Sequence, residues 1–118
     1  MAQFIIQGPT SLKGEYYCNG FKNAATPIIA ATLLIDEECI LDNVPRVADV
    51  EKMLDLLKSL GARVQWTEKN QVTINTANAD LKNLNADAMK SMRSSVLLTA
   101  PLLTRFKKIT IPEPGGCF

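Results

Sequence analysis

The sequence of 118 residues contains no histidine, which excludes a histidine-dependent catalytic triad, a histidine-ligated metal and a histidine pH switch within these residues. Cysteine is scarce, with only Cys18, Cys39 and Cys117. Because they are widely spaced and odd in number, they form no metal-type pair and cannot build a full disulfide framework, which favours a reduced setting. Cys18 and Cys39 lie in β-like runs and are interpreted as small core residues.

Neither sign of charge dominates, because the sequence has 13 basic and 12 acidic residues and a net charge of +1. This balance argues against nucleic-acid binding through bulk electrostatics. Apolar runs are short: none reaches the roughly 20 residues that cross a bilayer, and residues 1–7 lack the pattern of a signal peptide. We therefore expect no nucleic-acid partner, no membrane association and a cytoplasmic location.

What is present is a globular composition, 47% hydrophobic and 21% charged, in a length that suits one domain. The apolar spacing predicts an α/β or α+β domain. Expected helices cover residues 22–35, 49–60 and 86–105; expected strands cover 4–7, 12–18, 39–41, 63–66, 71–74 and 107–111.

The first expected helix begins either near Asn23 or at Thr26 and Pro27, since threonine caps well and proline suits the first helical position. Its residues leave little polar face, which predicts burial on most sides. In the last helix, Pro101 lacks a backbone donor and is expected to kink or divide it.

Lys22 and Asn23 are the first candidate for chemistry. A cation and an amide at a helix N-terminus suit an anion, because free backbone N–H groups and the helix dipole favour negative charge there. The alternative is an exposed lysine beside a capping asparagine, and the residues alone favour that alternative.

Two further motifs carry similar alternatives. Arg93, followed by Ser94 on an apolar segment, either presents its fork to a phosphate or carboxylate or extends to solvent. Cys117 follows two glycines and is either an accessible functional thiol or part of a chain end.

These motifs in this order resemble one family. The segments that carry the resemblance are residues 20–34, 43–50, 60–62, 92–95, 101–103 and 114–117. They are similar to the N-terminal part of the UDP-N-acetylglucosamine enolpyruvyl transferase family, and the resemblance covers nearly all of the chain. The most specific motifs are Lys22-Asn23 and the Gly-Gly-Cys run that ends at Cys117.

The resemblance implies transfer of the enolpyruvyl group from phosphoenolpyruvate to the 3-hydroxyl of UDP-N-acetylglucosamine, the first committed step of peptidoglycan synthesis. No metal and no organic cofactor is implied. The implied fold has two domains built from βαβαββ units with inner helices and outer sheets. Residues 1–118 would then be an incomplete portion of the enzyme, inactive alone, with strands in 1–20 belonging to the partner domain.

The resemblance also assigns roles to residues. Lys22 matches the lysine that contacts the phosphate of phosphoenolpyruvate, and Asn23 matches the amide at the reacting sugar. Arg93 matches an arginine of the UDP-sugar site, with Ser94 and Leu97 at neighbouring contact positions. Cys117 matches the loop cysteine assigned as proton donor at C3 and alkylated by fosfomycin.

The sequence departs from the family pattern at its end, where Pro112, Glu113 and Pro114 precede the glycines and the bulky Phe118 follows the cysteine. The remaining catalytic residues are expected from the rest of the enzyme, which would cover an exposed apolar face that could otherwise self-associate. Two alternatives stay open: a non-catalytic UDP-sugar-binding or interaction module, and a shikimate-pathway enolpyruvyl transferase relative.

Overall fold

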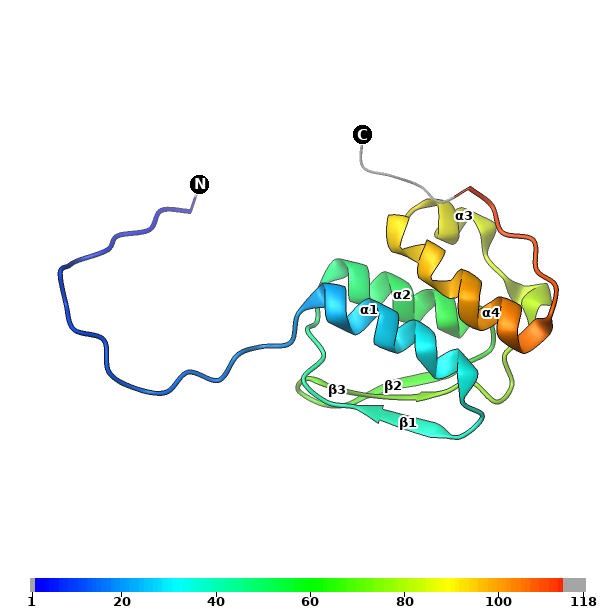
Figure 1. Ribbon diagram of the computed structural model, residues 1–118, viewed down its shortest axis with the longest axis horizontal. Coiled ribbons are helices and arrows are strands. Elements are labelled where there is room, and N and C mark those ends of the chain that lie inside the picture. Colours follow the sequence, from blue (N-terminus) through cyan, green and yellow to red (C-terminus); the bar gives the residue numbers. More distant parts are fainter. Residues whose placement is uncertain (1, 114–118) are drawn as a thin grey trace.

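The computed structural model describes residues 2–113 as an antiparallel sheet with helices packed on one of its faces (Figure 1). The sheet order is β1-β3-β2, so β3 lies in the middle and pairs with both neighbours. The elements are α1 Lys22–Ala31, η1 Thr32–Leu34, β1 Glu38–Leu41, α2 Ala48–Ser59, β2 Arg63–Glu68, β3 Gln71–Asn75, η2 Leu81–Asn83, α3 Ala86–Lys90, η3 Arg93–Leu98 and α4 Thr99–Phe106.

The core lies between the sheet and the helices, because each of these elements turns one apolar face toward the other layer. Along β3 every second residue is buried, and Val72 and Ile74 point to the helices. The apolar stripe of α2, which includes Met53 and Leu57, is fully buried against them. The mixed α/β class, the hairpin and the helix predicted at 49–60 are confirmed.

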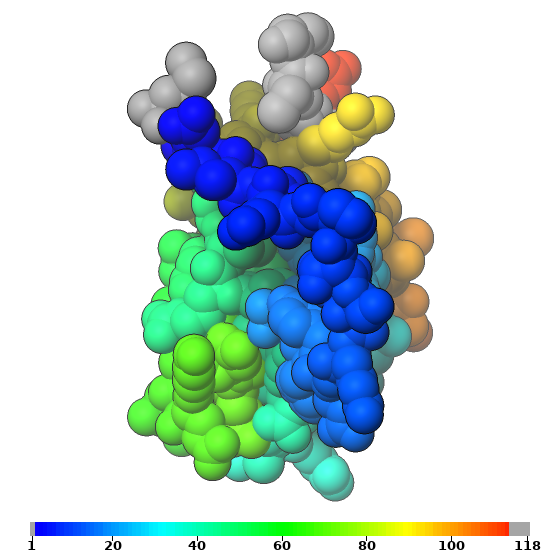
Figure 2. Space-filling view, turned by 90° about the vertical axis from the view of Figure 1, so that its left-hand side faces the viewer, coloured from blue at the N-terminus to red at the C-terminus, as the bar shows by residue number. Residues whose placement is uncertain are grey.

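The strand predicted at 107–111 is wrong, because residues 107–113 contain no strand. Residues 2–20 form no strand within this chain either, and the expectation that strands there belong to the partner domain stays a prediction. The side chains of 2–19 are all exposed, and this N-terminal segment leaves the body at the start of α1, so it has no sheet edge to pair with (Figure 1). In Figure 2 the segment stands in front of the folded body. At the other end, Lys107 has a φ of 66° and turns the chain at the end of α4, after which Ile109 packs on the core without strand pairing.

The helix predicted at 86–105 is broken, but at Met92 and not at Pro101. Met92 is extended, and the buried Oγ of Ser95 lies 2.8 Å from the carbonyl oxygens of both Met89 and Met92, which share its one proton. These side-chain bonds replace helical backbone bonds and stabilise the break. Pro101 lies in the first turn of α4, where a missing N–H costs little.

The helix predicted at 22–35 begins at Lys22, and Pro27 lies inside it. Burial on most sides is wrong: Ile29 is fully buried, but Ile28 and Leu34 are 52% and 55% exposed. The helix contacts α2 and η3 on one side. Within the described residues, this leaves an apolar strip of α1 around Ile28 uncovered. Cys18 is also exposed and not a core residue; Cys39 is half-buried, and burial raises the pKa of its thiol.

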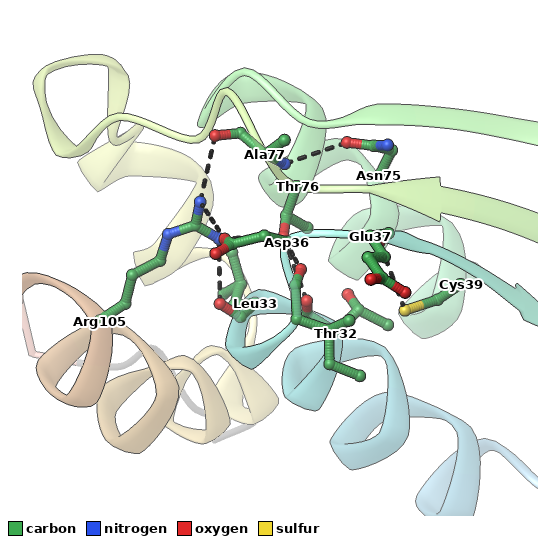
Figure 3. A network of polar contacts seen from close by, with 10 residues as sticks. Thr32, Leu33, Asp36, Glu37, Cys39, Asn75, Thr76, Ala77 and Arg105 are labelled. Atoms are coloured by element: carbon green, nitrogen blue, oxygen red, sulfur yellow. Dashed lines mark hydrogen bonds and ion pairs between the residues drawn. The ribbon is translucent and has the colours of Figure 1, made fainter.

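Arg105 joins the end of the chain to the middle of the fold (Figure 3). Its guanidinium donates to the carbonyl of Leu33 at 3.0 Å, the hydroxyl of Thr76 at 3.0 Å and the carbonyl of Ala77 at 3.2 Å. It also pairs with Asp36 at 3.2 Å. This cluster, the Arg105 network, ties α4 to η1 and to the end of β3.

Candidate functional site

The candidate site is a hollow of about 490 Å³ at the starts of α1, α2 and η3. Lys22 is the first residue of α1, Asp49 is the second of α2, and Arg93 is the first of η3. The residues that line the hollow are Lys22, Asn23, Thr26, Asp49, Met92, Arg93, Ser94, Val96 and Leu97. The starts of the two α-helices, α1 and α2, and the cations Lys22 and Arg93 therefore border one space, which favours an anionic ligand.

The position of α1 at this hollow depends on a close approach at Gly20. The Gly20 N–H donates to Oδ1 of Asn43 at 2.9 Å, and Nδ2 of Asn43 donates to the Cys18 carbonyl at 3.3 Å. Asn43 adopts a φ of 54°, a conformation that asparagine tolerates better than most residues. These bonds fix the chain just before α1 and so set where Lys22 emerges.

Lys22 and Asp49 form an ion pair and a hydrogen bond between Nζ and Oδ2. Their side chains are 47% and 41% exposed, so both groups reach the solvent in the hollow. The hydrogen bond from Lys22, with the charges of Lys22 and Lys52, holds the pKa of the Asp49 carboxyl below its usual range. Asp49 is therefore a carboxylate at neutral pH.

Five of the six residues singled out by sequence lie together around this hollow. Lys22 and Asn23 come from α1, and Arg93, Ser94 and Leu97 come from η3, about 70 positions later in the chain. The sixth, Cys117, lies outside the described residues. The catalytic and binding roles of all six stay predictions.

Sequence reasoning missed Asp49. It was interpreted as the start of a helix, which its place in the first turn of α2 confirms, and it lies in the 43–50 segment that carries the resemblance, but no role was assigned to it. Its pairing with Lys22 spans 27 positions and two different helices, so no local spacing reveals it. The remaining signal is its acidity at a helix start, which is common and unspecific.

Comparison with known proteins identifies the fold and the family. Residues 6–117 match the model of the EPSP synthase family, described as EPSP synthase (3-phosphoshikimate 1-carboxyvinyltransferase). The chain belongs to this family. The enolpyruvyl transferase NikO from Streptomyces tendae matches 74% of this chain and 20% of its own, with a TM-score of 0.66 at 20% identity, which supports the fold.

Curated relatives that are similar to this chain over almost its whole length carry a more specific name. The UDP-N-acetylglucosamine 1-carboxyvinyltransferase of Elusimicrobium minutum is 43% identical over 118 residues, and that of Dichelobacter nodosus is 41% identical over 117. Each alignment covers 99% of this chain and 28% of the relative. This member of the EPSP synthase family thus spans about 28% of the length of the curated relatives it matches.

Within the part of the chain that the structure describes, no helix combines the length and the apolar character needed to cross a membrane.

Proposed function

We propose that this chain supplies part of the substrate site of a UDP-N-acetylglucosamine 1-carboxyvinyltransferase. The observation that carries the proposal is the meeting of Lys22, Asn23 and Arg93 around one hollow, although they lie on two separate elements. The shared name of the curated relatives favours UDP-N-acetylglucosamine over a shikimate-derived acceptor. A cytoplasmic location is part of the proposal and agrees with the scarcity of cysteine.

The proposed reaction is an addition followed by an elimination. The 3-hydroxyl oxygen of the sugar adds to C2 of phosphoenolpyruvate and loses its proton, while C3 gains a proton. The C2–O bond to phosphate then breaks, C3 loses a proton, and phosphate leaves with the bonding electrons. Nothing is oxidised or reduced, and peptidoglycan synthesis would consume the product.

The residues of this chain would bind charge and orient the substrates. The ammonium of Lys22 would bind the phosphate of phosphoenolpyruvate, and the Asn23 amide would orient the sugar hydroxyl. The Arg93 fork would bind the UDP-sugar beside Ser94 and Leu97. Cys117 would donate the proton to C3.

The test is a titration of the 118-residue chain with UDP-N-acetylglucosamine, in which calorimetry measures the binding affinity. We expect Arg93→Ala to weaken binding about tenfold or more, because a charge-assisted contact is lost. Arg63→Ala is the matched control, since Arg63 is exposed on β2 and away from the hollow. No binding by the wild-type chain, or equal binding by Arg93→Ala, would contradict the proposal.

Turnover is tested in two proteins. The 118-residue chain alone is expected to release no phosphate from the two substrates, and clear turnover would refute this. A chimera in which the chain replaces the matching segment of the Elusimicrobium minutum relative is expected to turn over, and Lys22→Ala in the chimera to abolish activity. Binding by the chain without turnover by the chimera would favour a non-catalytic UDP-sugar-binding module.

The N-terminal segment is proposed to pack against another domain of the whole enzyme. Its apolar residues Phe4, Ile5, Leu12 and Tyr16 are 82–93% exposed in this chain, which is unusual for large apolar side chains. The uncovered strip of α1 is proposed to be covered in the same way, and two copies of the chain could otherwise meet there.

Limited proteolysis measures the exposure of the N-terminal segment. Trypsin is expected to cleave after Lys13 at least about tenfold faster than after Lys52 or Lys58, because exposed irregular chain is cut before helix. In the chimera, cleavage after Lys13 is expected to slow markedly. Equal rates at the three lysines of the 118-residue chain, or no protection in the chimera, would argue against this packing.

A further inference from the structure

Asp49 has no role in the proposed function, yet it occupies the same hollow. Of the described residues that line this space, Asp49 is the acidic one, and it faces the cation expected to bind phosphate. A carboxylate beside an anion site ordinarily weakens it, because like charges repel. Its presence there calls for a physical account.

Helix capping does not account for the direction in which Asp49 points. Glu51 also lies in the first turn of α2 and complements the helix dipole there. The Glu51 carboxylate turns away, toward Arg46 at 3.3 Å and the indole N–H of Trp66 at 3.4 Å. Asp49 instead reaches across to Lys22 on α1.

The Lys22–Asp49 pair is accessible to a competing anion. Both side chains are more than 40% exposed, and ion pairs of this exposure are weak because water screens them. A dianionic phosphate brings more charge to the ammonium than one carboxylate does. The carboxylate therefore competes with such a ligand without blocking it.

We propose that Asp49 sets the anion affinity of the hollow: it is a resident counter-anion that holds the Lys22 ammonium and that an incoming phosphate group must displace or share. When the ligand leaves, Asp49 takes the ammonium back. The identity of the ligand rests on the proposed function. In that reaction, competition from Asp49 lowers the affinity of the hollow for released phosphate and speeds the departure of the phosphate.

The test uses inorganic phosphate as the probe, titrated into the 118-residue chain and followed by NMR shifts of the backbone amides at the start of α1. Asp49→Asn is expected to tighten phosphate binding about three- to tenfold, because a repelling charge is removed. Asp49→Glu keeps the charge and is expected to stay within about twofold of wild type. Asp55→Asn is the matched control, since Asp55 lies on α2 and pairs with Lys58 away from the hollow.

A second pair of variants separates counter-charge from a structural effect. Lys22→Gln is expected to abolish the gain from Asp49→Asn, because the two changes act through one contact. Asp49→Ala repeats the test with a smaller side chain, and circular dichroism checks that each variant is folded. Unchanged or weaker phosphate binding in folded Asp49→Asn and Asp49→Ala overturns the inference, as does a lack of phosphate binding in every protein.

The same titration with phosphoenolpyruvate and UDP-N-acetylglucosamine separates this inference from the proposed function. If phosphate affinity responds to Asp49→Asn and neither substrate binds, the proposed function fails and the inference stands. If the substrates bind and Asp49→Asn changes no affinity, the reverse holds.

Discussion

Replacement of Arg105 by alanine is expected to lower the free energy of unfolding by about 2–4 kcal/mol. The Arg105 side chain is 17% exposed, and its guanidinium bonds the carbonyls of Leu33 and Ala77 and the hydroxyl of Thr76. Alanine leaves these acceptors in a partly buried place without their charged donor, which costs more than loss of an exposed contact. Urea denaturation followed by circular dichroism measures the change.

Two further variants sharpen this prediction. Arg105→Lys keeps the charge but not the planar fork, so it is expected to recover only part of the loss. Arg63→Ala removes an exposed arginine of β2 and is expected to change stability by less than about 0.5 kcal/mol. If Arg105→Ala and Arg63→Ala unfold at the same urea concentration, the Arg105 network contributes nothing to stability.

Gly20→Ala is expected to destabilise the chain by about 2–3 kcal/mol and to lower the anion affinity of the hollow. A Cβ at position 20 would lie 1.7 Å from the Asn43 carbonyl oxygen, and that oxygen belongs to backbone that cannot simply rotate away. Relief requires movement of the chain before α1 and loss of the bond from the Gly20 N–H to Asn43. Lys22, two residues later, would move with it.

Gly8→Ala is the matched control for Gly20→Ala. A Cβ at Gly8 meets nothing within 4 Å, so this variant is expected to match wild type in urea denaturation and in phosphate titration. Gly20→Ala with wild-type stability and wild-type phosphate affinity would show that the close approach at Asn43 does not position α1.

Local patterns predicted the elements that build the core. The alternation in 71–74 and the helical spacing in 49–60 gave β3 and α2 because these elements bury one face, which leaves a periodic trace in the residues. The runs 4–7 and 12–18 have β-favouring side chains as well, but a strand also needs a partner, and the sequence of one run does not supply it. The break at Met92 depended on the bonds of the Ser95 hydroxyl, which spacing does not show.

In the candidate site, too, some residues could be predicted from the sequence and others depend on distant contacts. Lys22, Asn23 and Arg93 were found through unusual residue types beside helix starts and through family resemblance, and the fold brings them together. Asp49 was missed because its importance lies in a contact across two helices. Arg105 was missed for a similar reason, since its partners come from two distant segments, one at residues 33–36 and one at residues 76–77.

The Arg105 network also has a mechanical consequence. It holds the chain just beyond the far end of α1, through Leu33, while Lys22 stands at the near end. Ten helical residues span about 15 Å, so a tilt of about 5° around the held end would carry Lys22 by about 1 Å. The end held by Arg105 thus acts as a pivot, and the tightness of that pivot limits the precision with which the ammonium is aimed into the hollow.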